Sequence, residues 1–320
     1  MNINKPGVIL ITTLLIVMIM SVISIQISKK FFISIQREAY LDFKNQSYQV
    51  LLSAEAQAIK SIQKEIISSQ AKLTNNDPIF RSLSFFLNDI SKIQVDVVDG
   101  SNCFNLNNIF SATGNKFQIK SSNVEWLERL LRFKGLNDAE IESFIDQLID
   151  WVDTDSQPLN YGAEDYFYMG PMSAINQFTP KRLLESISEI RNFPIMETLD
   201  FRDFSKNLCV VSGSSQQSIN INTLSSSHAI LIAAFFDEKN LEFIESQISN
   251  APEEGYNSID LFTAKMTQLK NNRLDVFAVN SRNFILTSRV YNETFSNELE
   301  SLVILDNSNV AMVLNRNFSF

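Results

Sequence analysis

The sequence predicts an α+β protein in which a long amino-terminal helix precedes an antiparallel sheet, and a large helical insertion interrupts that sheet. The first observation is an uncharged apolar run from Val8 to Ser28. The second is the alternating pattern of Lys92–Asp99, which is typical of a half-buried strand. The third is the order of elements, because about 165 mostly helical residues follow this strand before strand patterns return. A sheet with strands at both ends of a helical segment accounts for this order.

The amino-terminal run is long enough to cross a membrane. At about 1.5 Å per residue, the run gives roughly 31 Å of helix, close to the thickness of one hydrocarbon core. The helix pattern continues past Lys29 and Lys30 until it is broken at Asn75–Pro78, so we expect one helix from about Val8 to about Ala71. Residues 8–28 are its predicted transmembrane part, and residues 29–74 its predicted part outside the membrane.

Three interpretations of this start are open. A secretory signal peptide would be cut near a small residue such as Ser21, Ser24 or Ser28, although the helix pattern continues through all three. A plain single-span anchor would not be cut. A leader of the type IV pilin kind would comprise residues 1–7 and would be cut between Gly7 and Val8. Gly7 stands directly before the apolar run, as this third interpretation requires.

The composition excludes several functions. The chain has 320 residues and a formal net charge of −9, which gives nucleic-acid binding no electrostatic support. Glycine is scarce, and neither a Walker pattern nor a dinucleotide fingerprint is present. His228 is the only histidine and stands at the start of a predicted helix, so a Ser-His-Asp arrangement is not expected. Trp126 and Trp151 lie on apolar helix faces and are expected in the core. We expect no enzymatic activity.

The insertion is expected to contain two related helical lobes. Cys103–Ile109 is similar to Ser218–Leu224, and paired amphipathic helices follow each of these Asn-rich turns. The lobes would cover about residues 103–210 and 218–272 within an inserted domain of residues 103–272. The predicted helices are Asn123 to about Gly135, Ala139–Trp151, Pro180 to about Arg191, Ser226–Phe236, Glu238–Ser249 and Ile259 to about Lys270.

Residues 75–102 and 273–320 are expected to form the sheet domain. Ile79–Leu87 is expected to be a short helix or loop over the core. Besides Lys92–Asp99, the predicted strands are Leu274–Val279, Phe284–Tyr291, Ser301–Leu305 and Val310–Leu314.

Several motifs, in chain order, together resemble the K-type minor pseudopilin of the type II secretion system. They are the leader ending at Gly7 with its apolar helix, Phe104–Asn107, Asp150–Asp155, Gly162–Asp165 and Asn220–Leu224. The resemblance implies a pilin-like sheet and an all-helical insertion of two SAM-like lobes. It also implies a single-pass protein of the bacterial inner membrane, with its carboxy-terminal domain in the periplasm.

The resemblance also implies a role and partners. The subunit would stand at the tip of the pseudopilus and would support pseudopilus initiation and protein export across the outer membrane. Its partners would be the I- and J-type minor pseudopilins, the major pseudopilin, the prepilin peptidase and the inner-membrane assembly platform, and no nucleic acid. Two other roles are open, namely a minor pilin or tip adhesin of a type IV pilus, and an uncleaved single-span periplasmic scaffold.

Thr12 supports the K-type resemblance. The family pattern in most pilins and pseudopilins has Glu at the fifth residue after the cleaved Gly, and here that residue is Thr12. The K-type is the known exception. A buried carboxylate without a partner is costly in lipid, so an uncharged residue suits a subunit with nothing above it at the tip.

An acidic cluster gives the chain its one candidate metal site. Asp146, Asp150 and Asp153 share one face of a predicted helix and precede a loop. Oxygen ligands from a helix end and its loop are what Ca²⁺ takes, and the family resemblance implies calcium in the insertion. The expected ligands are Asp150, Asp153, Asp155, Glu164 and Asp165. The alternative is a solvated acidic loop with capping aspartates.

Cys103 and Cys209 flank the first lobe. Two cysteines in an exported domain can pair, and a bridge here would close a loop of about 105 residues at the base of the insertion. We expect this disulfide, and the alternative is two buried free thiols.

Overall fold

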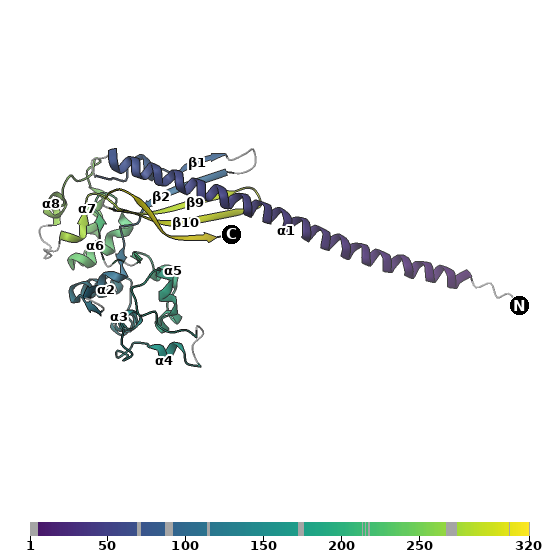
Figure 1. Ribbon diagram of the computed structural model, residues 1–320, viewed down its shortest axis with the longest axis horizontal. Helices are drawn as coiled ribbons and strands as arrows, with labels where there is room; N and C mark the ends of the chain where they lie inside the picture. Colours follow the sequence, from purple (N-terminus) through teal and green to yellow (C-terminus); the bar gives the residue numbers. More distant parts are fainter. Residues whose placement is uncertain are drawn as a thin grey trace.

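The computed structural model describes residues 6–68, 72–86, 92–113, 116–171, 176–212, 214, 216, 218–266, 274–306 and 308–319. Helix α1 (Pro6–Ser68) runs without interruption, and Figure 1 shows its first half projecting away from the rest of the molecule. The predicted long helix is confirmed, although it ends at Ser68 and residues 72–74 are not helical. The Thr74 N–H donates to Asp77 Oδ2 at 2.6 Å, which forms a turn just before Pro78.

The second half of α1 lies across a five-stranded sheet of order β1-β2-β9-β10-β11 (Figure 1). All neighbouring strands are antiparallel. The strands are β1 (Leu83–Phe86), β2 (Lys92–Asp99), β9 (Asn283–Tyr291), β10 (Ser296–Leu305) and β11 (Ala311–Ser319). Strands β2 and β9 are adjacent in the sheet although the whole insertion separates them in sequence, so the predicted architecture is confirmed.

The sheet turns one face toward α1. Every second residue of β9 and β10 is buried, as the two-residue period of a strand requires. These residues and one stripe of α1 form a hydrophobic core that includes Leu51, Ile62, Leu286 and Val303. The apolar contact between helix and sheet therefore fixes which face of α1 is covered.

The insertion connects β2 to β9 and contains more than helices. Its helices are α2 (Ser121–Phe133), α3 (Asp138–Val152), α4 (Asp165–Tyr168), α5 (Phe201–Phe204), α6 (Ala229–Phe236), α7 (Leu241–Ser249) and α8 (Ile259–Thr263). Its short strands are β3 (Phe104–Asn105), β4 (Phe110–Thr113), β5 (Lys116–Ile119), β6 (Leu208–Cys209), β7 (Ile219–Asn220) and β8 (Phe277–Ala278). The prediction of all-helical lobes is wrong in this respect.

The two lobes share one hydrophobic core. That core is separate from the core beneath α1. Helix α2 of the first lobe packs on α6 of the second, where Trp126 Nε1 donates to Leu231 O at 3.1 Å and Arg129 Nε donates to Ala234 O at 2.6 Å. Because these carbonyls belong to α6, the lobes are joined by hydrogen bonds as well as by apolar contacts.

The internal repeat has a structural basis in paired asparagines. Asn105 Oδ1 accepts from the Asn107 N–H, and Asn220 Oδ1 accepts from the Asn222 N–H. The amide of Asn107 bonds both the N–H and the carbonyl of Leu184, and Asn222 bonds Tyr256 in the same way. The first asparagine of each pair also belongs to a two-residue parallel ladder, which is β3 with β6 for Asn105 and β7 with β8 for Asn220. The two Asn-x-Asn segments therefore make equivalent hydrogen bonds in the two lobes.

Three sequence predictions are corrected by this fold. Leu83–Phe86 is strand β1 and not a helix or loop, because it pairs with Lys92–Val95 at the sheet edge. Leu274–Val279 does not join the large sheet. Its first part is a 3-10 turn (Leu274–Val276), and Phe277 and Ala278 pair with β7, so the second lobe extends past residue 272.

The helix expected from Pro180 to about Arg191 is also wrong. The Thr179 hydroxyl and N–H both bond Asp165, and the Leu184 backbone is held by Asn107. Lys181 adopts a left-handed conformation with φ of 50° between them. Tertiary hydrogen bonds thus hold this segment extended, and only a 3-10 turn (Ile187–Asn192) follows, capped by Ser186.

The remaining helix and strand boundaries differ by a few residues from those predicted. Asp237 is left-handed and ends α6, so α7 begins at Leu241 after its cap Asn240 and not at Glu238. Helix α8 ends at Thr263 and a 3-10 turn continues to Met266, while residues 267–270 lie outside the described residues. Strands β10 and β11 are longer than predicted.

Candidate metal centre and membrane anchor

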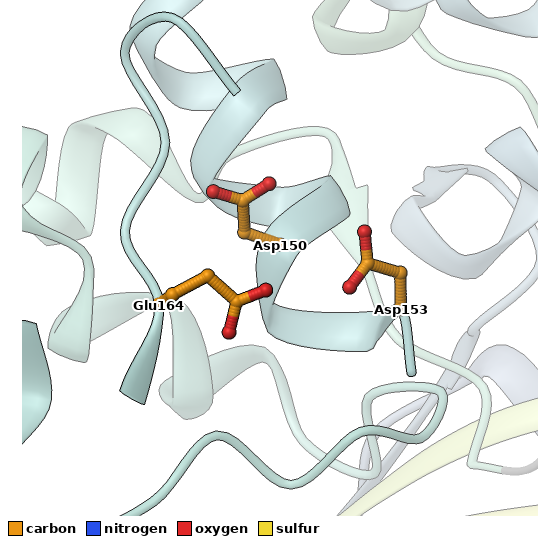
Figure 2. A group of neighbouring side chains, drawn as sticks. All are labelled: Asp150, Asp153 and Glu164. Atoms are coloured by element: carbon orange, nitrogen blue, oxygen red, sulfur yellow. The ribbon is translucent and has the colours of Figure 1, made fainter. Parts of the chain in front are cut away.

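Asp150, Asp153 and Glu164 form an acidic group in the first lobe. One carboxylate oxygen from each lies within 4.8 Å of the others. Figure 2 shows Asp150 on the last turn of α3, Asp153 just beyond the end of that helix, and Glu164 on the neighbouring loop with its side chain directed toward them. Among the described residues this is the one cluster of His, Cys, Asp or Glu side chains with metal-binding spacing.

The loop is shaped around Asp150, which is fully buried. The Leu159 N–H donates to Asp150 Oδ2 at 3.2 Å. A Cβ on Gly162 would meet the same oxygen at 1.8 Å, so only glycine lets the loop pass this close to the carboxylate. The Gly162–Asp165 motif therefore brings Glu164 to the end of α3.

The group has unused polar atoms that a cation would satisfy. Asp153 Oδ1, Glu164 Oε1 and the Tyr168 hydroxyl are buried and have no hydrogen-bond partner within the described chain. Buried polar atoms of this kind are rare in folded proteins. Three carboxylates supply hard oxygens, and Ca²⁺ takes six to eight of them, with backbone carbonyls and water completing the set. The residues present therefore fit calcium.

The electrostatics of the group point the same way. Burial raises the pKa of Asp150 to about 6, and the neighbouring aspartates add to the effect. Burial likewise raises the pKa of Glu164 to about 7 and that of Asp153 above its usual range. Three carboxylates that disfavour their own charge are stabilised by a bound divalent cation.

The other predicted ligands lie outside this group. Asp155 is exposed and accepts from the Gln157 N–H at 2.9 Å. Asp165 accepts from the Thr179 N–H and hydroxyl and pairs with Lys181 at 3.5 Å. Asp146 shares the helix face of the cluster but was not an expected ligand, and it accepts from the Tyr161 N–H at 3.0 Å. Sequence spacing could not distinguish the carboxylates that hold the loop by hydrogen bonds from the three that lie close to one another.

The disulfide prediction is confirmed. Cys103 and Cys209 are bonded, at the entry and the exit of the first lobe. Cys103 directly precedes β3 and Cys209 is the last residue of β6, so the bond lies beside the parallel ladder of these two strands. Trp126 and Trp151 are buried as predicted, and His228 caps the turn before α6 by accepting from the Ser225 N–H.

The amino-terminal half of α1 is apolar and uncovered. Its large side chains from Ile9 to Ile35 are all exposed. Within the described residues, α1 is the one helix long and apolar enough to cross a membrane, with a mean hydropathy of 2.5 over its most apolar window. Thr12 carries no charge, and its hydroxyl donates to Ile9 O at 2.9 Å within the helix. Gly7 and Val8 lie in the first turn of α1.

These features define a class of protein. A long apolar helix whose second half packs on an antiparallel sheet is the architecture of a pilin-like subunit, and here a two-lobed helical domain interrupts the sheet. The crystal structure of the GspK-GspI-GspJ complex from the enterotoxigenic Escherichia coli type 2 secretion system contains a chain of the same fold. The TM-score is 0.71 at 22% identity, over 87% of this chain and 98% of that one.

Sequence comparisons point to one family. Residues 102–213 match the family model described as type II secretion system (T2SS), protein K. The chain is 31% identical over 209 residues to a type II secretion system protein K of Pseudomonas aeruginosa and 28% identical over 211 residues to one of Klebsiella pneumoniae. Each match covers 64% of this chain, but only 59% and 63% of those relatives.

Proposed function

We propose that this protein is a minor pseudopilin at the tip of a type II secretion pseudopilus, where it supports pseudopilus initiation and protein export. The observation that supports this most directly is the combination of an exposed apolar helix with a protein K domain inserted into a pilin-like sheet. The protein is held in the inner membrane by residues 8–28, with the remainder in the periplasm. Its role is structural and involves no catalysis.

Partners follow from the same proposal. The chain with the same fold belongs to a complex with GspI and GspJ, which supports I- and J-type minor pseudopilins as neighbours here. The major pseudopilin, the prepilin peptidase and the inner-membrane assembly platform are the further proposed partners. The uncharged Thr12 suits a position with no subunit above it. At such a position no amino terminus of a neighbouring subunit would be present to pair with a carboxylate.

Processing of the leader tests the proposal. The intact mass of the protein isolated from membranes is expected to lack Met1–Gly7, leaving Val8 at the amino terminus. A Gly7→Leu variant should keep the full mass, because it changes the residue at the cleavage site. An uncut wild-type chain would favour the anchored scaffold, and a cut near Ser28 would favour a secreted protein. A cut after Gly7 would still allow a minor pilin of a type IV pilus. Co-purification with I- and J-type subunits would then favour the secretion system.

We also propose that Asp150, Asp153 and Glu164 bind Ca²⁺. The cation would join the end of α3 to the 159–165 loop and so stabilise the first lobe. Because protons compete for carboxylates whose pKa values are raised, calcium should bind more weakly at pH 5.5 than at pH 7.5.

Calcium addition is expected to stabilise the full-length protein in detergent micelles. At a calcium concentration one hundred times Kd, the gain is about 2.7 kcal/mol, or several degrees in the melting temperature of the lobe. Terbium replaces calcium at such sites, and Trp151 stacks edge-on against Tyr168 beside the cluster with ring centroids 5.1 Å apart. Excitation of these rings should therefore produce terbium emission that calcium suppresses.

The structure supplies a matched control for the metal site. Asp153→Asn should weaken binding at least about tenfold because it removes a charged ligand. Asp155→Asn should weaken it much less, because the exposed Asp155 is not in the group and acts on it only through its charge. Equal affinity for both variants, or no response of the wild type to millimolar calcium, would eliminate this site.

A further inference from the structure

Three polar side chains are buried between α1 and the sheet and have no hydrogen-bond partner among the described residues. Ser47 on α1, Ser288 on β9 and Asn297 on β10 are each 1% exposed. The hydroxyls of both serines and both amide atoms of Asn297 form no hydrogen bond with any described group. Elsewhere in this interface the polar groups are paired, since Glu55 bonds Arg316 and the Ser301 hydroxyl.

The strand register brings Ser288 and Asn297 together. Leu299 of β10 lies opposite Ser288, and Asn297 lies opposite Val290. Asn297 and Ser288 are therefore diagonal neighbours on the same face, about 7–8 Å apart at their Cα atoms. Both side chains point toward α1, because both occupy the buried positions of their strands.

Two contacts on either side place Ser47 above this pair. Phe43 packs on Phe295 with ring centroids 5.6 Å apart, and Glu55 bonds Ser301. From the first contact to the second, α1 covers about 18 Å along its axis and β10 covers about 20 Å. The helix and the strand therefore run side by side over nearly equal lengths. Ser47 is then about 6 Å beyond Phe43, and Asn297 about 7 Å beyond Phe295. The serine lies over the asparagine.

Apolar side chains enclose the polar atoms of Ser47, Ser288 and Asn297. The rings of Tyr40, Phe43 and Phe295 cluster on the side toward the membrane. Leu51 and Leu299, both fully buried, lie on the other side. Four polar atoms that do not reach one another, enclosed by apolar side chains, have the properties of a site for an internal water, which typically makes about three hydrogen bonds.

We propose that Ser47, Ser288 and Asn297 bind an ordered internal water that joins α1 to the sheet. Asn297 offers both a donor and an acceptor, and each serine hydroxyl can do either, so the three residues can complete the hydrogen bonds of one water. The water lies close to where α1 leaves the globular part of the molecule. It therefore helps to fix the register of the helix on the sheet, together with the Glu55–Arg316 pair further along.

Single substitutions distinguish a bound water from polar groups that are merely unpaired. If the water is present, Ser47→Ala or Asn297→Leu removes one of its partners and leaves the others unsatisfied. Amide hydrogen exchange of β9 and β10, measured by mass spectrometry on the full-length chain in micelles, should then speed up about fivefold. If no water is bound, each substitution removes an unsatisfied group and exchange should slow down instead, which would overturn the proposal.

Two further variants complete the test. Ser53→Ala changes an exposed serine of the same helix, whose hydroxyl bonds Gln49 O, and so measures the effect of helix propensity alone. The triple variant Ser47→Ala/Ser288→Ala/Asn297→Leu removes every partner at once and should restore protection to within about twofold of wild type. Additive losses in the triple variant would also contradict a shared water.

Discussion

Replacing both Cys103 and Cys209 with serine is expected to lower the free energy of unfolding of the first lobe by about 4–5 kcal/mol. The bond joins residues 106 positions apart. It therefore restricts a long loop in the unfolded chain, and the entropy lost there grows with loop length. The hydrophobic core that the two lobes share would remain, so we expect a folded but much less stable domain.

The two tryptophans make this loss measurable in the lobe itself. Trp126 and Trp151 both lie in the first lobe, and the chain has two tryptophans in all. Urea unfolding followed by tryptophan fluorescence should therefore shift strongly in the double serine variant. Reductant should produce a similar shift in the wild type and none in the variant. A loss below about 1 kcal/mol would mean that the unfolded chain is already compact or that the lobe unfolds without opening this loop.

The sequence predicted the fold well where local pattern and tertiary structure agree. The long helix has a long apolar run, β2 alternates, α2 and α3 have helical periodicity, and α3 also has the Asn137 capping box. The prediction failed where distant groups decide the conformation. Thr179-Pro180 has the form of a helix start, but Asp165 and Asn107 hold the following residues extended. Strand β1 has four residues at a sheet edge, so its apolar pattern is too short to distinguish it from a loop.

The candidate metal site could be predicted as a region but not as a ligand set. Helical spacing placed Asp150 and Asp153 correctly at the end of α3. It could not show that Asp165 is already bonded to Thr179 and Lys181, since those contacts depend on the path of the loop. Gly162 carried a usable signal, because a glycine just before Ala163 and Glu164 permits the close approach to Asp150 that the structure shows. The paired asparagines were visible as a repeat, whereas their partners Leu184 and Tyr256 were not.

The contact between α1 and the sheet depends on one buried carboxylate. Glu55 has a side chain only 4% exposed, and it accepts two hydrogen bonds from Arg316, from Nε at 3.0 Å and from Nη2 at 2.9 Å. The Ser301 hydroxyl donates to the same carboxylate. A buried ion of this kind is stable only while its partner neutralises it, so loss of the arginine leaves an uncompensated charge in the interface.

Arg316→Ala is therefore expected to destabilise the helix–sheet contact by about 3–5 kcal/mol. Arg289→Ala is the matched control on the other face of the sheet. The two arginine side chains are similarly exposed, at 45% and 42%, but the carboxylates of Asp96 and Glu298 that pair with Arg289 are 26% and 32% exposed. Water can solvate those carboxylates, so the control should cost about 1 kcal/mol or less.

Hydrogen exchange of β10 amides in the full-length chain measures both losses. Adding Glu55→Gln to Arg316→Ala should recover part of the stability, because it removes the buried charge. Equal losses for the two arginines would show that burial of Glu55 does not govern the strength of this contact.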